Sequence, residues 1–350
     1  MALCRLRSRS QTPMADQMAS GEGFGLDCEL PVPLDNPRQL FAQIPQIPNL
    51  EVYFQNTEDI VKLLLSGDLD MGIVGLDTVS EYGQGKEDLI IVHNALGYGH
   101  CYLSLEIPKE HEDFEKINSV MELSQMPKWN EKEPLVVATS FPKLGQKFMK
   151  EKGLKHVRFF SPKGAVEVAP KMGTAHVVLD LVNTGETLRA NNLREIDGGI
   201  ALESQAVLVA SRKSLLYRVG ALGTTHEILK RLEEHLKAVG QFKVTGYMSG
   251  SSFEEVAEQV FSQLTLSGLE EPAIHQVFHR RDGEMVVDSY AIDICGPKEL
   301  LDSPVQQQLR AMGACRVQVS QITKIYDQVN SKWQELRSKL GEENLSKLGL

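Results

Sequence analysis

The stretch AHVVLDLVNTGETLR, residues 175–189, holds the residue types and spacing of a phosphate-binding turn. Its apolar run 177–179 predicts a buried strand that ends at Asp180. The polar turn that follows opens a helix, whose free backbone N–H groups and dipole attract a phosphate, and Thr184 and Thr187 add hydroxyl donors. Asp180 would repel a phosphate but can accept hydrogen bonds from ribose hydroxyls. The stretch therefore predicts a ribose 5-phosphate cradle, although many Thr-Gly turns between strand and helix bind no ligand.

Charge and composition exclude several classes of function. The net charge of −10 argues against non-specific nucleic-acid binding, and no apolar run approaches the roughly 18 residues of a membrane-spanning helix. The five cysteines are scattered without a CxxC pair, so we expect a reducing compartment and neither disulfides nor a zinc site. His93, His100 and His156 are not at metal-ligand spacing, and the metal ligands are unknown. At 350 residues, two or three domains are expected.

Residues 1–35 form an N-terminal segment with two interpretations. Its first 20 residues hold three arginines and several serines, with no acid before Asp16, which is typical of the end of an organellar transit peptide. The alternative is a divergent first strand and loop.

From residue 36, strand-like and helix-like patterns alternate twice, as in an α/β protein. We expect one lobe from 36–107 plus 190–225 and a second lobe from 108–189, with ligands bound in the crevice between them. The expected strands are 50–54, 69–74, 88–92, 98–107, 135–138 and 156–160, and the expected helices begin at 57, 76, 143 and 164.

The pattern changes after the helix predicted over 224–239. Residues 240–326 give the order βαββαβ of a ferredoxin-like unit, with a hairpin turn at Arg281-Asp282-Gly283. This unit has no catalytic cluster, so a regulatory or assembly role is expected. The tail 327–350 predicts a charged, peripheral helix.

Three motifs in this order resemble those of the ATP phosphoribosyltransferase family, in its long form and most closely its plant members. They are GDLDMGIVGLD at 67–77, GAVEVAP at 164–170 and DLVNTGETL at 180–188, within a resemblance that spans about 36–322. The resemblance implies two periplasmic-binding-protein-like lobes with a cleft between them, plus a C-terminal ferredoxin-like regulatory domain.

The resemblance also implies the reaction. The family joins N1 of ATP to C1 of 5-phosphoribosyl 1-pyrophosphate, giving 1-(5-phosphoribosyl)-ATP and pyrophosphate, the first step of L-histidine biosynthesis. Mg²⁺ would neutralise the leaving group, and histidine would inhibit through the C-terminal domain. We expect a homo-oligomer between dimer and hexamer, located in the plastid or otherwise in the cytoplasm, with no nucleic-acid or membrane partner.

By the same resemblance, Asp180 and Glu167 are the catalytic residues. The residues that would bind phosphoribosyl pyrophosphate are Asp180, Asn183, Thr184, Gly185, Glu186 and Thr187. The nucleotide side would be lined by Asp70, Gly72, Gly75 and Asp77. The alternative for Glu167 is a carboxylate that stabilises a helix start, and for Asp70 a turn residue at a strand end.

The chain departs from the family pattern at three places. Residues 7–13 stand where a glycine-rich basic loop is usual, and Tyr102 stands where arginine is usual. Gly313-Ala314-Cys315-Arg316 replaces a glycine-rich turn in the last domain. Two of these changes remove positive charge near the expected pyrophosphate. The alternative function is therefore a non-catalytic or weakly active paralogue that acts as a nucleotide-binding, phosphoribosyl-binding or regulatory module.

Overall fold

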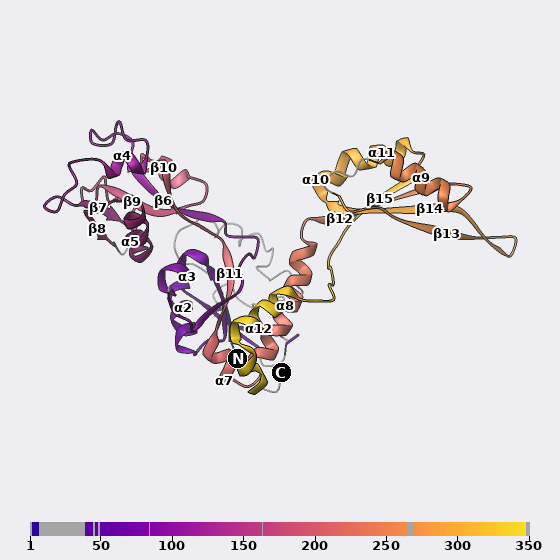
Figure 1. Ribbon diagram of the computed structural model, residues 1–350, viewed down its shortest axis with the longest axis horizontal. Helices are drawn as coiled ribbons and strands as arrows, with labels where there is room; N and C mark the ends of the chain where they lie inside the picture. The colour runs from indigo at the N-terminus through magenta and orange to yellow at the C-terminus, as the bar shows by residue number, and fades with distance from the viewer. Residues whose placement is uncertain are drawn as a thin grey trace. The chain divides into compact units, whose positions relative to one another are not determined.

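The computed structural model describes residues 2–6, 39–44, 46–47, 50–83, 85–162, 164–264 and 269–347. The chain divides into two compact units, one formed by Met1–Leu229 with Ser331–Leu350 and the other by Lys230–Asn330 (Figure 1). No helix in the described part of the chain is long and apolar enough to cross a membrane. The first unit contains two lobes, each built on its own sheet.

The first lobe is a six-stranded sheet in the order β2-β3-β1-β4-β11-β5. Its central strands are continuous apolar runs because both faces are covered, and α2 packs its buried Ile60, Val61 and Leu64 against them. Gly67 ends α2 in the left-handed conformation, at φ +83°. The elements are β1 (Ala2–Leu6), β2 (Phe41–Gln43), β3 (Glu51–Gln55), α2 (Thr57–Ser66), β4 (Met71–Gly75), α3 (Leu76–Tyr82), β5 (Leu89–His93), β11 (Ala206–Ser211) and α7 (Arg212–Tyr217).

The N-terminal segment contributes β1, which lies in parallel between β3 and β4. A strand is therefore present where the divergent-strand interpretation expects it. The expected loop 7–13 lies outside the described residues.

The second lobe is a five-stranded sheet in the order β10-β6-β9-β7-β8. One face packs on α4 and α5 around a large apolar core that includes Leu105, Phe148 and Leu179. The other face, which includes Val178, Val182 and Leu188, carries the candidate site. The elements are β6 (Cys101–Pro108), α4 (Val120–Ser124), β7 (Leu135–Ala138), α5 (Pro142–Glu151), β8 (Val157–Phe160), β9 (Val177–Val182), α6 (Glu186–Ala190) and β10 (Leu193–Ser204).

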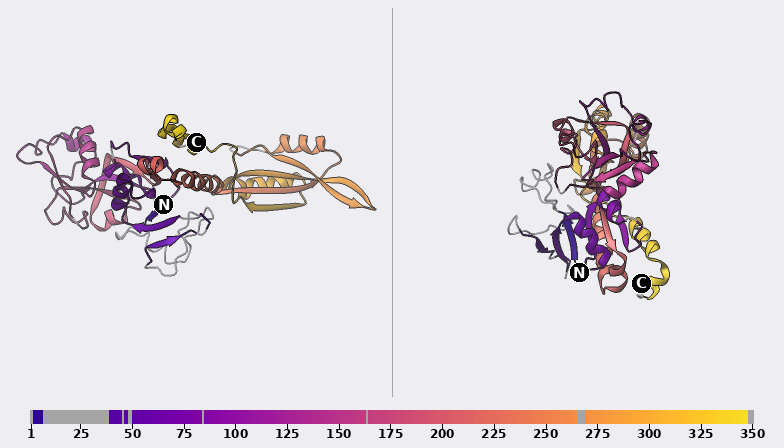
Figure 2. Two further views of the ribbon diagram at one scale, coloured as in Figure 1. Left: turned by 90° about the horizontal axis from the view of Figure 1, so that it is seen from below. Right: turned by 90° about the vertical axis from the view of Figure 1, so that its left-hand side faces the viewer.

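The structure differs from the expected lobe boundaries at β6 and β10. Both strands pair in the second sheet, antiparallel to each other, whereas we expected 98–107 and 190–225 in the first lobe. The change of sheet occurs at two short connections, one through Gly97 and Gly99 at positive φ and the other at Gln205. These connections join the lobes (Figures 1 and 2).

The second unit is an antiparallel sheet in the order β13-β14-β12-β15, the strand order of a ferredoxin-like βαββαβ unit. Its helical segments cover one face, and the β13–β14 hairpin extends past the rest of the sheet (Figures 1 and 2). The helix expected over 298–312 contains a π-helical segment, because Pro304 lacks the N–H that a regular ladder needs. The elements are β12 (Gln241–Ser249), α9 (Phe253–Gln263), β13 (Ala273–Arg281), β14 (Glu284–Pro297), α10 (Lys298–Leu300), η1 (Leu301–Val305), α11 (Gln306–Ala311) and β15 (Arg316–Gln321). Helix α8 (Ala221–Ala238) runs from the first unit into the second.

The C-terminal tail belongs to the first unit. It forms α12 (Ser331–Leu340) and α13 (Glu342–Lys347), which are separated by Gly341 at φ +88°. Leu336 and Leu340 share one helix face and are buried, and the Lys339 Nζ donates to the Ile91 carbonyl at 2.8 Å. The tail is therefore charged, as expected, but it also packs an apolar face on the first lobe.

Candidate active site

The predicted strand, turn and helix form as β9, the turn 183–185 and α6, but β9 does not end at Asp180 and continues to Val182. Gly185 lies at φ +70°, where a glycine is favoured, and directly precedes α6. The turn residues Asn183 and Thr184 are exposed, as are Glu186 and Thr187 at the start of α6. Because α6 has only five residues, its dipole is small, and the individual N–H and hydroxyl donors of the turn must supply most of the attraction for a phosphate.

Arg189 adds a cation at this turn that the sequence interpretation missed. Its guanidinium donates to the Thr184 carbonyl at 3.2 Å, so the side chain folds back over the turn. Arg189 is one helical turn after Gly185, and this spacing could have indicated from the sequence that its side chain lies beside the turn.

Asp180 faces the same side of the sheet as two polar residues of β6. Ser104 is directly opposite Asp180 in the cross-strand register, and Glu106 is opposite Val178. Burial raises the pKa of the Asp180 carboxyl to about 7; a hydrogen bond from the Leu181 backbone N–H opposes this, and the Glu167 charge adds to it. The Asp180 carboxyl therefore changes its ionisation state near neutral pH.

Glu106 and Ser104 lie beside Asp180 on the neighbouring strand β6 and were not predicted. Among the described residues, Glu106 Oε2 and Ser104 Oγ are buried without a hydrogen-bond partner. Burial raises the pKa of Glu106 to about 9, helped by the charges of Asp180, Glu167 and Glu195. At neutral pH, Glu106 is therefore a neutral carboxylic acid next to the candidate site.

We expect Glu106→Gln to change the pH dependence of stability. The folded chain keeps this proton up to about pH 9, whereas an unfolded chain releases it near the ordinary value of 4.5. The wild-type chain therefore loses stability as pH rises through this window, at up to about 1.4 kcal/mol per pH unit, and the glutamine variant escapes this loss. Denaturant unfolding at about pH 5, 7 and 9 measures the difference, with the exposed Glu133→Gln as control. Parallel curves for Glu106→Gln and wild type would contradict the burial of an ionisable Glu106.

Glu167 lies near Asp180 and Glu106, since its charge raises the pKa of both. The helix expected from 164 does not form, and residues 167–173 are a series of turns. Pro170 explains this difference, because it has no N–H to donate to the Val166 carbonyl and its ring would clash there. The alternative role of Glu167 as a helix-start carboxylate is therefore wrong.

Gly75 and Asp77 lie at the carboxyl end of β4, next to the connections between the lobes. The buried Asp77 carboxylate accepts hydrogen bonds from Ser204 Oγ at 2.8 Å and Thr78 Oγ1 at 2.7 Å. A Cβ on Gly75 would lie 2.7 Å from this carboxylate, so only glycine fits. The Cys101 thiol is 3.9 Å from Asp77, which brings Asp77 to the start of β6.

Asp70 and Gly72 lie away from this end of β4. Asp70 is fully buried at the amino end of β4, where its carboxylate accepts from Ser214 Oγ and pairs with Arg218 at 3.2 Å. A Cβ on Gly72 would lie 2.5 Å from Ile60, so this glycine allows α2 to pack closely. The contacts that the structure shows for both residues belong to the packing of the first lobe.

Tyr102 packs on the apolar face that carries the site and donates from its hydroxyl to Glu195 at 3.2 Å. The register places it opposite Val182, the last residue of β9, beside the turn. This position would suit a cation for a pyrophosphate, but here it holds a neutral side chain next to an acidic one.

The pocket that the structure shows between the lobes contains none of these site residues. It measures about 360 Å³ and lies between α3 and β5 on one side and α5 and β10 on the other. Among the described residues, no group of three or more His, Cys, Asp or Glu side chains is arranged to hold a metal ion. The candidate site therefore combines carboxylates, a donor-rich turn and one arginine.

Comparison with known proteins identifies the family of this chain. The family model described as ATP phosphoribosyltransferase (HisG) matches residues 56–235. Two proteins of Arabidopsis thaliana, named ATP phosphoribosyltransferase 2, chloroplastic, and ATP phosphoribosyltransferase 1, chloroplastic, are each 58% identical over 90% of this chain and 76% of their own length. A solved chain of the ATP phosphoribosyl transferase (HisG:HisZ) complex from Thermotoga maritima is similar over 66% of this chain and 96% of its own, at 20% identity and a TM-score of 0.47. This chain belongs to the ATP phosphoribosyltransferase family.

Proposed function

We propose that the Asp180 face and the turn 183–187 bind 5-phosphoribosyl 1-pyrophosphate, and that the chain joins its C1 to N1 of ATP. This is the first step of L-histidine biosynthesis. The observation that supports the site most directly is the last half of β9, where a carboxylate with a pKa of about 7 is followed, after Leu181 and Val182, by an exposed, donor-rich turn. A ribose 5-phosphate needs both groups next to each other, hydroxyl acceptors on one side and phosphate donors on the other.

The chemistry requires positioning and charge stabilisation. N1 of the adenine supplies the electron pair of the new bond, and the C1–oxygen bond breaks as pyrophosphate leaves with its electrons. Positive charge develops at the ribose, and the carboxylates of Asp180 and Glu167 would stabilise it. No covalent intermediate with the enzyme is needed, because holding the two substrates in line lowers much of the barrier.

Mg²⁺ fits this site as a companion of the substrate. The oxygen donors of Asp180 and Glu167 suit a hard cation, and Mg²⁺ is commonly held by one or two carboxylates together with substrate phosphates and waters. When bound, it would neutralise the leaving pyrophosphate. The role of the protein residues is to orient the ribose and its 5-phosphate beside it.

The nucleotide would bind on the first lobe near Gly75 and Asp77. These residues lie at the carboxyl end of β4, the edge at which ligands bind in such sheets. Asp77 is already hydrogen-bonded to Ser204, so it would act by fixing the backbone of this edge.

The plastid location that the names of the Arabidopsis relatives carry is our proposal for this chain too. Turnover of ATP plus phosphoribosyl pyrophosphate, followed through the absorbance of the N1 adduct, tests the activity. Product formation supports the proposal, and binding of both substrates without product would favour the non-catalytic paralogue. The carboxylate of Glu195, which accepts the hydrogen bond of the Tyr102 hydroxyl, gives that alternative some support, because its charge makes the pyrophosphate end of the site less favourable for an anion.

We further propose that the second unit mediates histidine inhibition and assembly. Its βαββαβ sheet lacks catalytic residues in the described part of the chain, and it forms a compact unit of its own, Lys230–Asn330.

We expect an internal deletion of 230–330 to give a folded, active enzyme that histidine does not inhibit. The design must keep the tail, because Leu336 and Leu340 are buried in the first unit. A short Gly-Ser linker can join the cut ends, since the rings of His226 and Trp333 are only 4.3 Å apart. Turnover with and without histidine, together with light scattering for assembly size, provides the measurement. Full inhibition in the deleted protein would rule out the second unit as the regulatory part.

A further inference from the structure

A buried carboxylate of the first lobe caps a helix of the second lobe. Glu81, in the last turn of α3, is 1% exposed. Its Oε1 accepts a hydrogen bond from the Lys143 N–H at 3.0 Å, and its Oε2 accepts one from the Leu144 N–H at 2.9 Å. We call this arrangement the interlobe cap.

Helix α5 has no cap of its own that could replace Glu81. Its N-cap residue, Phe141, makes no side-chain hydrogen bond, and its first turn contains no acidic residue. The first helical residue is Pro142, which has no N–H, and the Gly145 N–H already bonds within the helix. The free donors at this end are thus those of Lys143 and Leu144, and Glu81 satisfies both.

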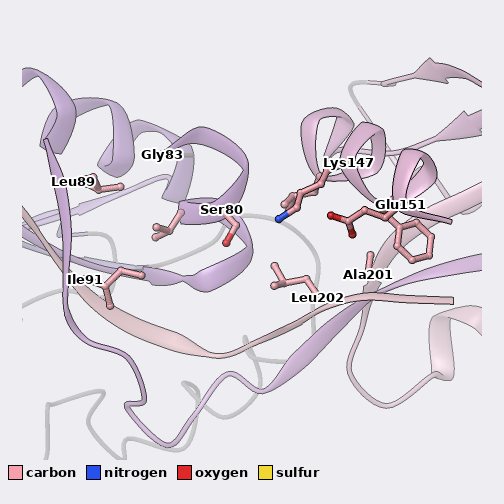
Figure 3. Close-up of a pocket in the computed structure, with 11 residues that line it drawn as sticks. Ser80, Gly83, Leu89, Ile91, Lys147, Glu151, Ala201 and Leu202 are labelled. Carbon is pink, nitrogen blue, oxygen red and sulfur yellow. The ribbon is translucent and has the colours of Figure 1, made fainter. Parts of the chain in front are cut away.

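The interlobe cap is a polar contact at the edge of an incompletely packed interface. The pocket of about 360 Å³ lies beside it, and Figure 3 shows Ser80 of α3 across this space from Lys147 and Glu151 of α5. The Lys143 Nζ also lies 5.6 Å from the ring centre of Tyr82. Helix α3 follows the carboxyl end of β4, and α5 follows the carboxyl end of β7. The interlobe cap therefore joins the two lobes at segments that come directly after strands of their sheets.

We infer that Glu81 is a positioning residue for the reaction, because it fixes the separation between the lobe that binds ATP and the lobe that binds phosphoribosyl pyrophosphate. This inference rests on the proposed function. Each substrate is held by its own lobe, so removing the cap leaves each binary complex intact. The bond-forming step requires the two lobes to hold their substrates at a fixed separation, so removal of the interlobe cap should lower kcat.

The test compares Glu81→Ala and Glu81→Gln with Glu122→Ala in the full chain. Glu122 belongs to a capping box at the start of α4, within one lobe, so its removal costs a helix cap without touching the interface. Amide hydrogen exchange at Lys143 and Leu144 reports the cap without any substrate. Steady-state kinetics and the Kd of phosphoribosyl pyrophosphate alone report its effect on positioning.

We expect Glu81→Ala to lose protection at both amides and to lower kcat about tenfold, the size of a lost cap near the upper end of its range, while that Kd stays unchanged. Glu81→Gln should fall between, because its amide retains one acceptor oxygen. Glu122→Ala should keep both protection and kcat. Unchanged protection in Glu81→Ala would overturn the cap, and lost protection with unchanged kcat would overturn the positioning role. Failure of the wild-type chain to form product would instead refute the proposed function, because the exchange result does not depend on it.

Discussion

Asp180→Asn is expected to weaken the binding of phosphoribosyl pyrophosphate by about 1.5–3 kcal/mol, roughly 10- to 150-fold. The substitution keeps the shape of the side chain and removes its charge. A carboxylate can accept hydrogen bonds from ribose hydroxyls with both oxygens, whereas an amide offers one oxygen and presents a donor in place of the other. The loss is that of a charge-assisted hydrogen bond in a half-buried position.

The pH dependence of phosphoribosyl pyrophosphate binding gives a second test of whether Asp180 belongs to the site. Burial raises the pKa of Asp180 to about 7, so the wild-type chain should bind more tightly as pH rises through this value. The asparagine variant should lose that dependence. The folded chain keeps the Asp180 proton up to about pH 7, whereas the unfolded chain releases it near the ordinary value of 3.8. The wild-type chain therefore loses folding stability as pH rises between these two values. The variant should therefore fold at least as well near pH 8.

Titration calorimetry at about pH 6, 7 and 8 measures both effects. Asp113→Asn is a suitable control, because Asp113 lies in the same lobe and pairs with Lys128 rather than with a residue of the candidate site. Equal affinity of Asp180→Asn and wild type at every pH, with equal melting temperatures, would remove Asp180 from the site.

The parts of the fold that the sequence predicted are those set by local patterns. The strand β9 and its turn follow from three consecutive apolar residues and a Thr-Gly pair, and α2 follows from its period and the glycine after it. The hairpin at Asp282-Gly283 formed for the same reason, since both residues adopt the positive φ that this turn needs.

The errors come from partners that lie far away in the sequence. Asp70 and Asp77 flank the same strand in one motif and look equivalent, yet Asp70 pairs with Arg218 and only Asp77 reaches the edge between the lobes. Glu106 could be recognised only through its register with β9. The sheet to which β6 belongs is likewise decided by its pairing with β9 and β10, which no local pattern encodes.

Tyr102→Arg is expected to raise the affinity for phosphoribosyl pyrophosphate or the turnover, by up to about 2.7–4 kcal/mol, roughly a hundredfold or more. The family resemblance implies arginine in this strand, and the structure places position 102 opposite Val182, next to the turn that follows Asp180. A guanidinium there could form a bidentate contact with the leaving pyrophosphate. Burial raises the pKa of the Tyr102 hydroxyl, and the charge and hydrogen bond of Glu195 raise it further, so Glu195 also favours a cation at this position.

Glu195 determines how much of this gain appears. It accepts the Tyr102 hydroxyl hydrogen bond at 3.2 Å and would pair with an arginine at the same position. Part of the new charge would then be neutralised before a substrate arrives, so Tyr102→Arg with Glu195→Gln should gain more than Tyr102→Arg alone.

Tyr102→Phe is the matched control, because it keeps the ring on the apolar face and removes only the hydroxyl. Steady-state rates and melting temperatures of the four proteins, wild type included, distinguish the outcomes. A rate that stays level or falls in both arginine variants, together with a lower melting temperature, would show that this position serves to pack the tyrosine ring. The cation for the pyrophosphate would then have to come from another residue, and Arg189 on the turn is the first candidate.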